Sequence, residues 1–598
     1  MKASKKAAFR LFKKHITRLT TIIAIVLVSV GFMSGVGEVE NKIKIAERDL
    51  YEQSRVADLK IISNNPFGFT AEEIGKVQEK FGEENVKTGF FYEAEQNGRA
   101  LRYYIQDTDN PINALELVDG NMPSAPNEIL AERETDGIQA HSVGDTVVFT
   151  HPITQLETEF TVCGIVNNPL HIYNKAEPSF TKDTDGEYLT LGQVYYTDSE
   201  APFIVNDIYV HIGAKTLGKL FNDSYVENVE TLRAETETLL GASATVLTLE
   251  ENIGLYSLYS YAEKVGQIGI IFVVFFLLVT LLVVYSTMSR LFDEERAQIA
   301  CQKTLGFSDW KVTKKYVLFV AVGAVLGGVG GFFVGLLLTS MLYNGFNLQY
   351  NMPRFPNSLN FSYYAMTFGI ILVATVALAI LSGKKATSGE PAKLLTPKAP
   401  KAGKKVILEK IPFIWKALSF KYKSTVRNVL LFKSRFFMTV VSVVGATVLV
   451  FAGLGLFNCA VNYGDAESLM AISAVLIVFS GLLCALVIYN LTNINVSERT
   501  REIATLMVLG YHDKEVTGYI YREVYIMCAI GAVLGVPLGM LFVNFVFDFI
   551  KFGSLAEVEW WSYVLTPVLT MAFGFISTLL LRKKIVKTDM NASLKTVE

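Results

Sequence analysis

Long apolar stretches alternate with polar segments along the chain, and their lengths predict a membrane protein. Each stretch has roughly 18 or more residues with few charges, and about 20 helical residues cross the hydrocarbon of a bilayer. We therefore predict eight transmembrane helices. They cover approximately residues 19–36, 265–288, 316–343, 361–382, 436–458, 468–491, 519–550 and 562–581.

The polar segment between the first two apolar stretches predicts a folded domain of mixed α and β structure. Residues 38–263 are numerous enough for an independent domain and contain both alternating and helix-periodic patterns. Asn97 and Gly98 stand between two alternating segments, which is a β-hairpin signal. We expect further strands at residues 58–63, 146–150 and 160–166, and helices at residues 70–82, which begin with a capping box, and 227–241.

One charged segment occurs twice, each time between two apolar stretches. The copies, residues 294–307 and 498–511, align at a constant offset. A repeated loop with repeated flanking spans indicates two halves, each offering one docking surface. The candidate contact residues are Glu294, Glu295, Arg296, Ile299, Leu305 and Gly306 in the first copy, and Glu498, Arg499, Glu502, Ile503, Leu509 and Gly510 in the second.

Each copy predicts a short helix that lies nearly parallel to the membrane. Gly306 and Gly510 follow a leucine at the expected helix end, as glycine often does. Asp309 and Asp513 then stand where an N-cap of the next helix is expected.

Glycines recur every four residues in the third and seventh apolar stretches. This spacing places them on one helix face, where a neighbouring backbone approaches closely. The candidate packing residues are Gly323, Gly327, Gly331 and Gly335 in the third stretch, and Gly531, Gly535 and Gly539 in the seventh.

The distribution of charge predicts the orientation of the spans. The chain is 51% hydrophobic, and its cations concentrate in residues 1–18, 383–435 and 582–587. Cytoplasmic segments carry an excess of Lys and Arg, so we expect both termini and both repeated loops in the cytoplasm. The basic start followed by an apolar run also resembles a signal peptide, but the run is long and has no small-residue cleavage site, which favours an uncleaved anchor.

The basic linker, residues 383–435, admits two interpretations. Its first part is rich in Pro and Lys, and its second part suits a basic amphipathic helix on the inner leaflet, with Phe413, Ile414, Leu418 and Phe420 inward. Alternatively, the linker is a basic loop that orients the fifth span.

Recognisable catalytic chemistry is sparse. The sequence has no GxxxxGK[ST] phosphate loop, so an ATPase that drives it is a separate polypeptide. It has no HExxH or GxSxG motif, and its five cysteines lack metal-ligand spacing. We expect no catalytic residue, metal, cofactor or nucleic-acid partner. Most spans are nearly free of ionisable residues, which argues against an ion-coupled carrier.

The two loops resemble the ER-x-x-EI-x-x-x-x-x-LG loop of the FtsX-like permease family, which includes MacB-type exporters. The second copy, ERTREIATLMVLG, matches better, because Gln298 replaces the glutamate in the first. Residues 117–133, with 141–149 and 160–166, resemble the external core domain of MacB-type permeases. The basic linker resembles that of the two-half permeases of Gram-positive bacteria.

The resemblance implies a permease subunit of an ATP-binding-cassette transporter in a bacterial cell membrane. Two copies of a separate ATPase would sit under the loops, and the spans would pass motion to the external domain for export or mechanotransmission of a peptide, lipid or lipoprotein. Membrane lipids and an unidentified external ligand are further expected partners. An ATP-independent receptor or scaffold with a binding module outside remains the alternative.

We therefore expect a mainly α, multi-pass membrane protein with two pseudo-repeated halves and one extracytoplasmic α+β domain. The expected boundaries are residues 1–37 for the basic N-terminus and first span, 38–263 for the external domain, 264–382 for spans two to four, 383–435 for the linker, 436–582 for spans five to eight, and 583–598 for the tail.

Overall fold

The computed structural model divides the chain into two compact units. The helical unit contains Met1–Val39, Val265–Leu342 and Leu359–Glu598, and the α/β unit contains Glu40–Lys264 and Tyr343–Ser358. The structure describes residues 3–395 and 433–586 apart from 97, 137, 151–156, 176–177, 183–186, 200–201, 203, 359 and 464–466; in the linker it also describes 423, 425 and 427. The predicted amphipathic helix around Phe413 lies outside the described residues.

Eight helices in the described part of the chain are long and apolar enough to cross a membrane, which confirms a polytopic membrane protein. Most of these helices are longer than the predicted spans, because the helical backbone includes polar residues next to the apolar stretch. They are α2 (Ile16–Gln53), α6 (Ile253–Glu294), α8 (Asp309–Gly345), α9 (Phe361–Thr387), α13 (Lys433–Asn462), α14 (Glu467–Glu498), α16 (Asp513–Ile550) and α17 (Trp560–Val586).

Helices α8 and α16 each pack a glycine face against a neighbouring helix. A Cβ added to Gly327 of α8 would stand 2.6 Å from the carbonyl oxygen of Ile23 in α2. A Cβ added to Gly531 of α16 would stand 2.6 Å from Cγ1 of Val443 in α13. Neither position has room for a side chain, so glycine permits the close approach of the backbones. The remaining glycines of the two series meet the same partners, because Gly323, Gly331 and Gly335 face α2, and Gly535 and Gly539 face α13.

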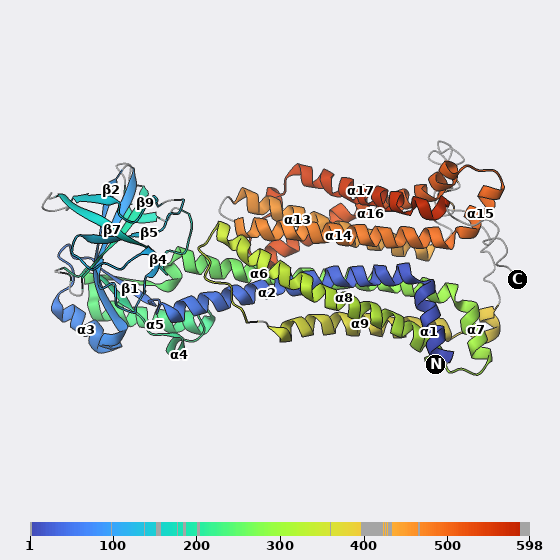
Figure 1. The fold of residues 1–598 in the computed structure, drawn as a ribbon, viewed down its shortest axis with the longest axis horizontal. Helices are drawn as coiled ribbons and strands as arrows, with labels where there is room; N and C mark the ends of the chain where they lie inside the picture. Colours follow the sequence, from blue (N-terminus) through green and yellow to red (C-terminus); the bar gives the residue numbers. More distant parts are fainter. Residues whose placement is uncertain are drawn as a thin grey trace. The chain divides into compact units, whose positions relative to one another are not determined.

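The α/β unit is built on a mixed sheet of eleven strands in its described part (Figure 1). The order is β11-β1-β10-β2-β3-β9-β5-β7-β4, with β6 beside β7 and β8 beside β9. The pairs β3–β9 and β5–β7 are parallel, and the other pairs are antiparallel. The strands are β1 (Leu59–Ser63), β2 (Val86–Gln96), β3 (Arg99–Gln106), β4 (Glu116–Gly120), β5 (Glu128–Glu132), β6 (Thr146–Thr150), β7 (Glu157–Asn167), β8 (Pro178–Lys182), β9 (Tyr188–Asp198), β10 (Asp207–Val210) and β11 (Ala244–Thr248).

The local predictions for this unit are confirmed. Helix α3 (Ala71–Phe81) begins with a capping box in which Thr70 and Glu73 exchange hydrogen bonds, and α5 (Asp223–Leu240) covers the second predicted helix. Strands β2 and β3 pair as the predicted hairpin, and β1, β6 and β7 cover the other predicted strands.

A short segment after α8 belongs to the α/β unit rather than to the helical unit, where sequence analysis had placed it. Tyr350 pairs with Tyr173 in an isolated bridge, and its hydroxyl donates to Ser257 at 2.9 Å. The backbone N–H of Asn351 donates to the carbonyl of Ile172 at 2.6 Å. These long-range contacts join Tyr343–Ser358 to the α/β unit.

Candidate functional site

The two repeated loops form a matched pair of short helices at one end of the helical unit (Figure 1). Helix α7 (Arg296–Thr304) follows α6 after a break at Glu295. Helix α15 (Thr500–Val508) follows α14 after a break at Arg499. The duplicated sequence therefore produces a duplicated structure.

Each short helix buries the same two positions against the following long helix. Ile299 and Ala300 of α7 are at most 1% exposed, and Ile503 and Ala504 of α15 are fully buried. Ile299 packs in the cluster that contains Val312 and Tyr316 of α8, and Ile503 packs in the cluster that contains Val516 and Ile520 of α16. These partners are equivalent at the offset of the repeat, so both loops rest on equivalent apolar supports.

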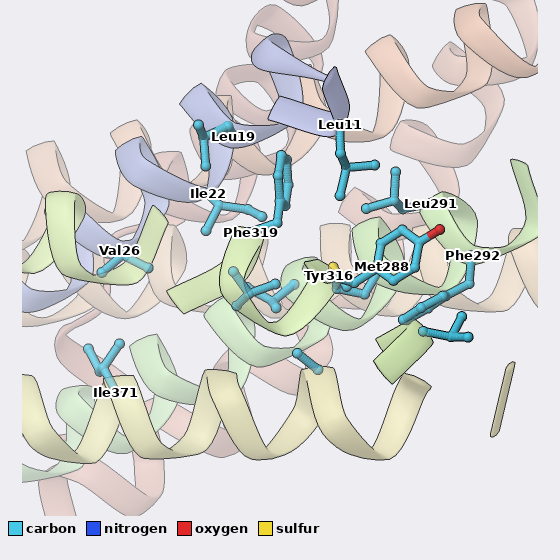
Figure 2. Packing of buried hydrophobic residues seen from close by; sticks show 14 of the residues in the cluster. Leu11, Leu19, Ile22, Val26, Met288, Leu291, Phe292, Tyr316, Phe319 and Ile371 are labelled. Carbon is cyan, nitrogen blue, oxygen red and sulfur yellow. The ribbon is translucent and has the colours of Figure 1, made fainter. Parts of the chain in front are cut away.

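The first support also includes the N-terminal helix α1 (Ala3–Lys14). Leu11 of α1 is buried with Leu291 and Tyr316, as Figure 2 shows. This part of the cluster continues through Phe319 to Leu19 and Ile22 of α2.

Both short helices end in the same Schellman motif. Gly306 has a φ of +83° and Gly510 has a φ of +89°, a conformation that favours glycine. The N–H of Phe307 donates to the carbonyl of Gln302, and the N–H of Tyr511 donates to that of Leu506, both at 3.1 Å. Each glycine follows the C-cap residue, which is a leucine.

The turn leaves a pair of apolar side chains exposed on each loop. Leu305 is 76% exposed and Leu509 is 68% exposed, although both precede a tightly built turn. Phe307 and Tyr511 flank the glycines and are about half exposed. We call Leu305 with Phe307 the first knob, and Leu509 with Tyr511 the second knob.

The predicted N-caps prove to be helical residues instead. Helix α8 begins at Asp309 and α16 begins at Asp513, so each aspartate occupies the first turn. His512 is the N-cap of α16 and forms a capping box with Glu515. The predicted cap was one residue late, because aspartate is favoured both at the N-cap and in the first turn of a helix.

Cations from α1 and the start of α2 anchor the first loop. Nζ of Lys14 donates to Oε1 of Glu295 at 2.6 Å, and the ring of His15 lies 3.3 Å from the same oxygen. Burial alone would raise the pKa of Glu295, but the hydrogen bonds from His15 and Lys14 outweigh it and lower the pKa to about 2. Arg18 pairs with Glu294. In the sequence, these cations indicated only the topology of the spans.

The C-terminal end of α7 is also held by contacts to other helices. Nζ of Lys303 lies 3.0 Å from Asp309 and donates to the backbone carbonyls of Thr387 and Gly389, at the end of α9. The first loop is therefore held at both ends.

The second loop uses an ion pair within its own half. Arg499 contacts Glu523 of α16 at 2.5 Å, and the two side chains are 12% and 6% exposed. Burial opposes the charge of Arg499, but the adjacent Glu523 outweighs this effect and raises the pKa of Arg499. Glu502 is 62% exposed. The side chain of Glu498 lies outside the described residues.

Glu295 and Arg499 occupy equivalent positions at the offset of the repeat, yet they carry opposite charges. Each lies at the break between a long and a short helix and is neutralised by a partner of opposite sign; the side chain of Glu295 is 2% exposed and that of Arg499 is 12% exposed. Arg296, one residue later, is partly buried. Among the predicted contact residues, the side chains of Leu305, Leu509 and Glu502 are exposed to solvent. The other side chains lie inside the loops and support them: Ile299, Ile503, Glu295 and Arg499.

No group of three or more His, Cys, Asp or Glu residues in the described part of the chain is arranged to hold a metal ion. The loops offer exposed apolar knobs on buried bases. Such a surface suits docking to another protein.

Comparison with known protein families identifies what the two loop-bearing segments are similar to. A model described as FtsX-like permease C-terminal matches residues 270–391 and 474–590. Each of these two segments is similar to the C-terminal domain of FtsX-like permeases. Each matched segment contains one of the two loops, so the family domain is present twice. A search of the curated proteins finds no match.

FtsX-like permeases are components of ABC transporters and generally pair with an ABC ATPase. The expectation of an FtsX-like permease is thus confirmed. This multi-pass membrane protein is a transporter component of the permease type.

Proposed function

We propose that this FtsX-like permease couples ATP hydrolysis by a separate ATPase to motion of its α/β unit, with one ATPase copy docked on each loop. The observation that carries the proposal is the matched pair of exposed knobs at one end of the helical unit. An ATPase dimer offers two equivalent docking surfaces, and two pseudo-equivalent loops suit it. The ATP stays on the partner, so the permease itself needs no cofactor.

The charge pattern supports a single orientation. Lys14 and Arg18 lie beside the first loop, and a basic segment follows α9. Positive residues favour the cytoplasmic side, so we place both loops and both termini in the cytoplasm of a bacterial cell. The α/β unit then lies outside.

Helix continuity supplies the route for motion. Helix α6 runs without interruption from Ile253 in the α/β unit to Glu294, directly before α7. Helix α2 likewise runs from Ile16 in the helical unit to Gln53 in the α/β unit. A helix transmits displacement because its backbone hydrogen bonds keep its length fixed. Movement of α7 by an ATPase therefore reaches the outside through α6, for export or mechanotransmission.

A charge placed in both knobs tests the proposal. Burying one leucine contributes about 1.5–3 kcal/mol, so Leu305→Asp with Leu509→Asp should lower ATPase association by at least tenfold. The partner is co-purified with the tagged permease, and its ATPase activity is then measured in nanodiscs. Leu239→Asp is the matched control, because Leu239 is an exposed leucine of α5 in the other unit.

Full association and activity of the double variant would contradict the proposal. Full biological function without any nucleotide-binding partner would favour the ATP-independent receptor or scaffold instead.

A further inference from the structure

A cavity of about 430 Å³ lies inside the α/β unit and is independent of the coupling loops. Its volume falls in the range of about 300–1,000 Å³ that is typical of small-molecule sites. Strands β1, β3, β10 and β11 contribute to the wall, and so do the loop around His171 and the residues that precede α6.

The cavity has an apolar side and a cationic side. Leu170, Leu247, Leu249 and Ile253 supply aliphatic surface. Tyr188 also lines the cavity and is 60% exposed. The occupant must therefore bring a substantial apolar body.

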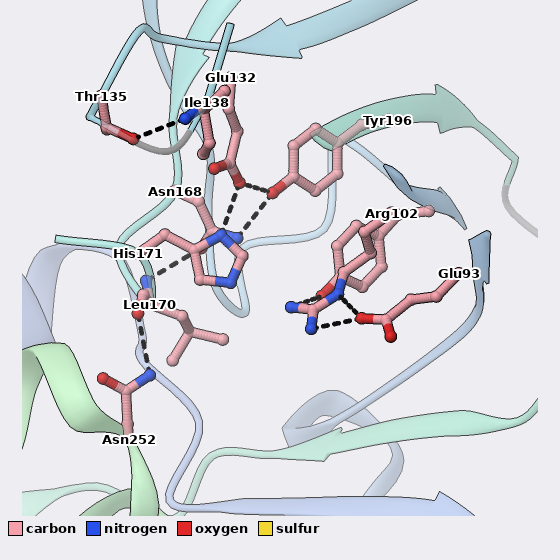
Figure 3. Close-up of polar contacts among 11 residues, drawn as sticks. Glu93, Arg102, Glu132, Thr135, Ile138, Asn168, Leu170, His171, Tyr196 and Asn252 are labelled. Carbon is pink, nitrogen blue, oxygen red and sulfur yellow. Dashed lines mark hydrogen bonds and ion pairs between the residues drawn. The ribbon is translucent and has the colours of Figure 1, made fainter. Parts of the chain in front are cut away.

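Lys60, Arg102 and His171 line the cavity, and the acidic partners described for them do not. Arg102 contacts Glu93 at 2.5 Å, and Nδ1 of His171 lies 2.8 Å from Glu132. Figure 3 shows the guanidinium of Arg102 and the ring of His171 directed toward a shared space, with Glu93 and Glu132 on their outer sides.

Lys60 extends this arrangement. Its Nζ lies 3.5 Å from Asp207, which does not line the cavity, and 5.3 Å from the ring centroid of Tyr209, which does. The side chain of Lys60 is 19% exposed, so its charge is accessible from the cavity.

The two carboxylates that do line the cavity are engaged elsewhere. Asp58 is fully buried and accepts hydrogen bonds from the hydroxyls of Tyr51 and Tyr225, both at 2.7 Å, and from two backbone N–H groups. Glu251 caps the preceding turn by accepting from the N–H of Thr248 at 2.8 Å. Among the contacts described, neither carboxylate pairs with Lys60, Arg102 or His171.

Electrostatic interactions weaken with distance, so a ligand in the cavity interacts more strongly with Lys60 and Arg102 at the wall than with the carboxylates behind them. We propose that this cavity binds a small amphipathic anion, with a carboxylate or phosphate head between Lys60, Arg102 and His171 and an apolar body against the leucines. The pairing behind the wall keeps the cations in place, so the site is formed before the ligand enters.

The ligand would also touch the start of α6. The side-chain amide of Asn252 donates to the carbonyl of Leu170 at 2.9 Å, beside His171, and Ile253 is the first residue of α6 (Figure 3). Occupancy would thereby reach the coupling loops and change ATPase activity. This second step rests on the proposed function, whereas binding does not.

A matched set of probes tests the chemistry of the head group. 1-Naphthylacetate, 1-naphthyl phosphate, 1-naphthylmethylamine and 1-naphthalenemethanol share one aromatic body and differ in charge. Their binding is measured by equilibrium dialysis against the full chain in nanodiscs, with empty nanodiscs subtracted and no ATPase present. We expect the anions to bind at least tenfold more tightly than the amine and the alcohol. The two anions distinguish a carboxylate ligand from a phosphate ligand.

Substitutions locate the binding. Lys60→Gln should weaken anion binding at least tenfold, and Ile253→Trp should abolish it by filling the cavity. Tyr188→Ala alters an exposed residue at the cavity, so it tests the site even if a buried change impairs folding, and it should weaken every probe. Lys76→Gln is the control on α3, where the lysine pairs only with its helix neighbour Glu72 among the contacts described for it.

Preference for the amine would overturn the proposal, and so would anion binding that none of the cavity variants alters. Anion binding without any change in ATPase activity would support the site and count against the coupling step alone.

Discussion

At the scale of residues, the informative position is the break between a long helix and a short one. Sequence analysis interpreted Arg499 as a contact for the ATPase, but its side chain is 12% exposed and holds Glu523. A single sequence shows that a charge is present but not whether the side chain faces inward. The leucines of the knobs could be predicted, because Leu305 and Leu509 precede the turn glycine in both copies, whereas Phe307 and Tyr511 were not among the predicted contact residues.

The buried position of Arg499 predicts a structural rather than a docking phenotype. Removing one member of a buried ion pair costs about 3–5 kcal/mol, since the other charge remains without its partner. Arg499→Ala should therefore lower the thermal unfolding midpoint of the detergent-solubilised protein by several degrees. Replacing both residues by leucine should restore most of the loss, because no charge is then left buried.

Glu502→Ala is the control on the same helix. Glu502 lies 3.9 Å from Arg499 but is 62% exposed, and exposed ion pairs contribute only about 0–1 kcal/mol. If Glu502→Ala lowered the midpoint as much as Arg499→Ala, the burial argument would be wrong.

At the scale of elements, the glycine series sets the packing of the two halves. Gly327→Leu should separate α8 from α2, because the carbonyl of Ile23 and the side chain of Val26 occupy the space for a Cβ. Gly535→Leu should do the same to α16 and α13 at Thr447. Overpacking of this kind costs about 1–3 kcal/mol or more, which size-exclusion chromatography after heating measures as lost monodisperse protein.

Gly369→Ala is the control that separates overpacking at a helix contact from the general effect of replacing a glycine. Nothing lies within 4 Å of a Cβ added to Gly369 in α9, and alanine favours a helix by up to about 1 kcal/mol relative to glycine. Its thermal stability should be unchanged or slightly higher. An equal loss at Gly369 and Gly327 would show that close packing is not what these glycines provide.

The elements themselves differ in how far the sequence predicts them. The eight long helices follow from apolar length, and the capped helix α3 follows from the residues at its start. The ends of these helices could not be predicted from the apolar stretches, because α2 and α6 continue as helices through polar residues beyond them. Short strands such as β5 and β10 escaped prediction, since four or five residues carry too little periodicity.

At the scale of the whole molecule, the duplication could be predicted but the long-range connections could not. The equivalent loops and glycine series predicted two halves. The halves were also predicted to differ, because the sequence has one external domain and it lies in the first half. The bridge between Tyr173 and Tyr350 and the pairing of Lys14 with Glu295 join residues far apart in the chain. Neither contact has a local sequence pattern.

The separate buried bases of the two loops lead to a prediction about stoichiometry. Each knob stands on its own buried base, so each should hold one ATPase independently when no nucleotide joins the ATPase copies. Native mass spectrometry of the nucleotide-free complex should then show two ATPases per permease chain. Leu305→Asp alone and Leu509→Asp alone should each leave one.

The two single variants should differ in a second respect. Loop one is tied to α1 through Lys14 and to the end of α9 through Lys303, whereas the ion pairs described for loop two join Arg499, at the break before α15, to Glu523 of α16 and to Glu502 of α15. An ATPase held only on loop one therefore acts on the loop that has more contacts to other helices. Its ATP-dependent movement should reach α6 directly, because α6 precedes that loop. Crosslinking between α6 and α14 should thus remain ATP-sensitive in Leu509→Asp and lose that sensitivity in Leu305→Asp. Release of both ATPases by either substitution would show instead that the two loops form one docking surface.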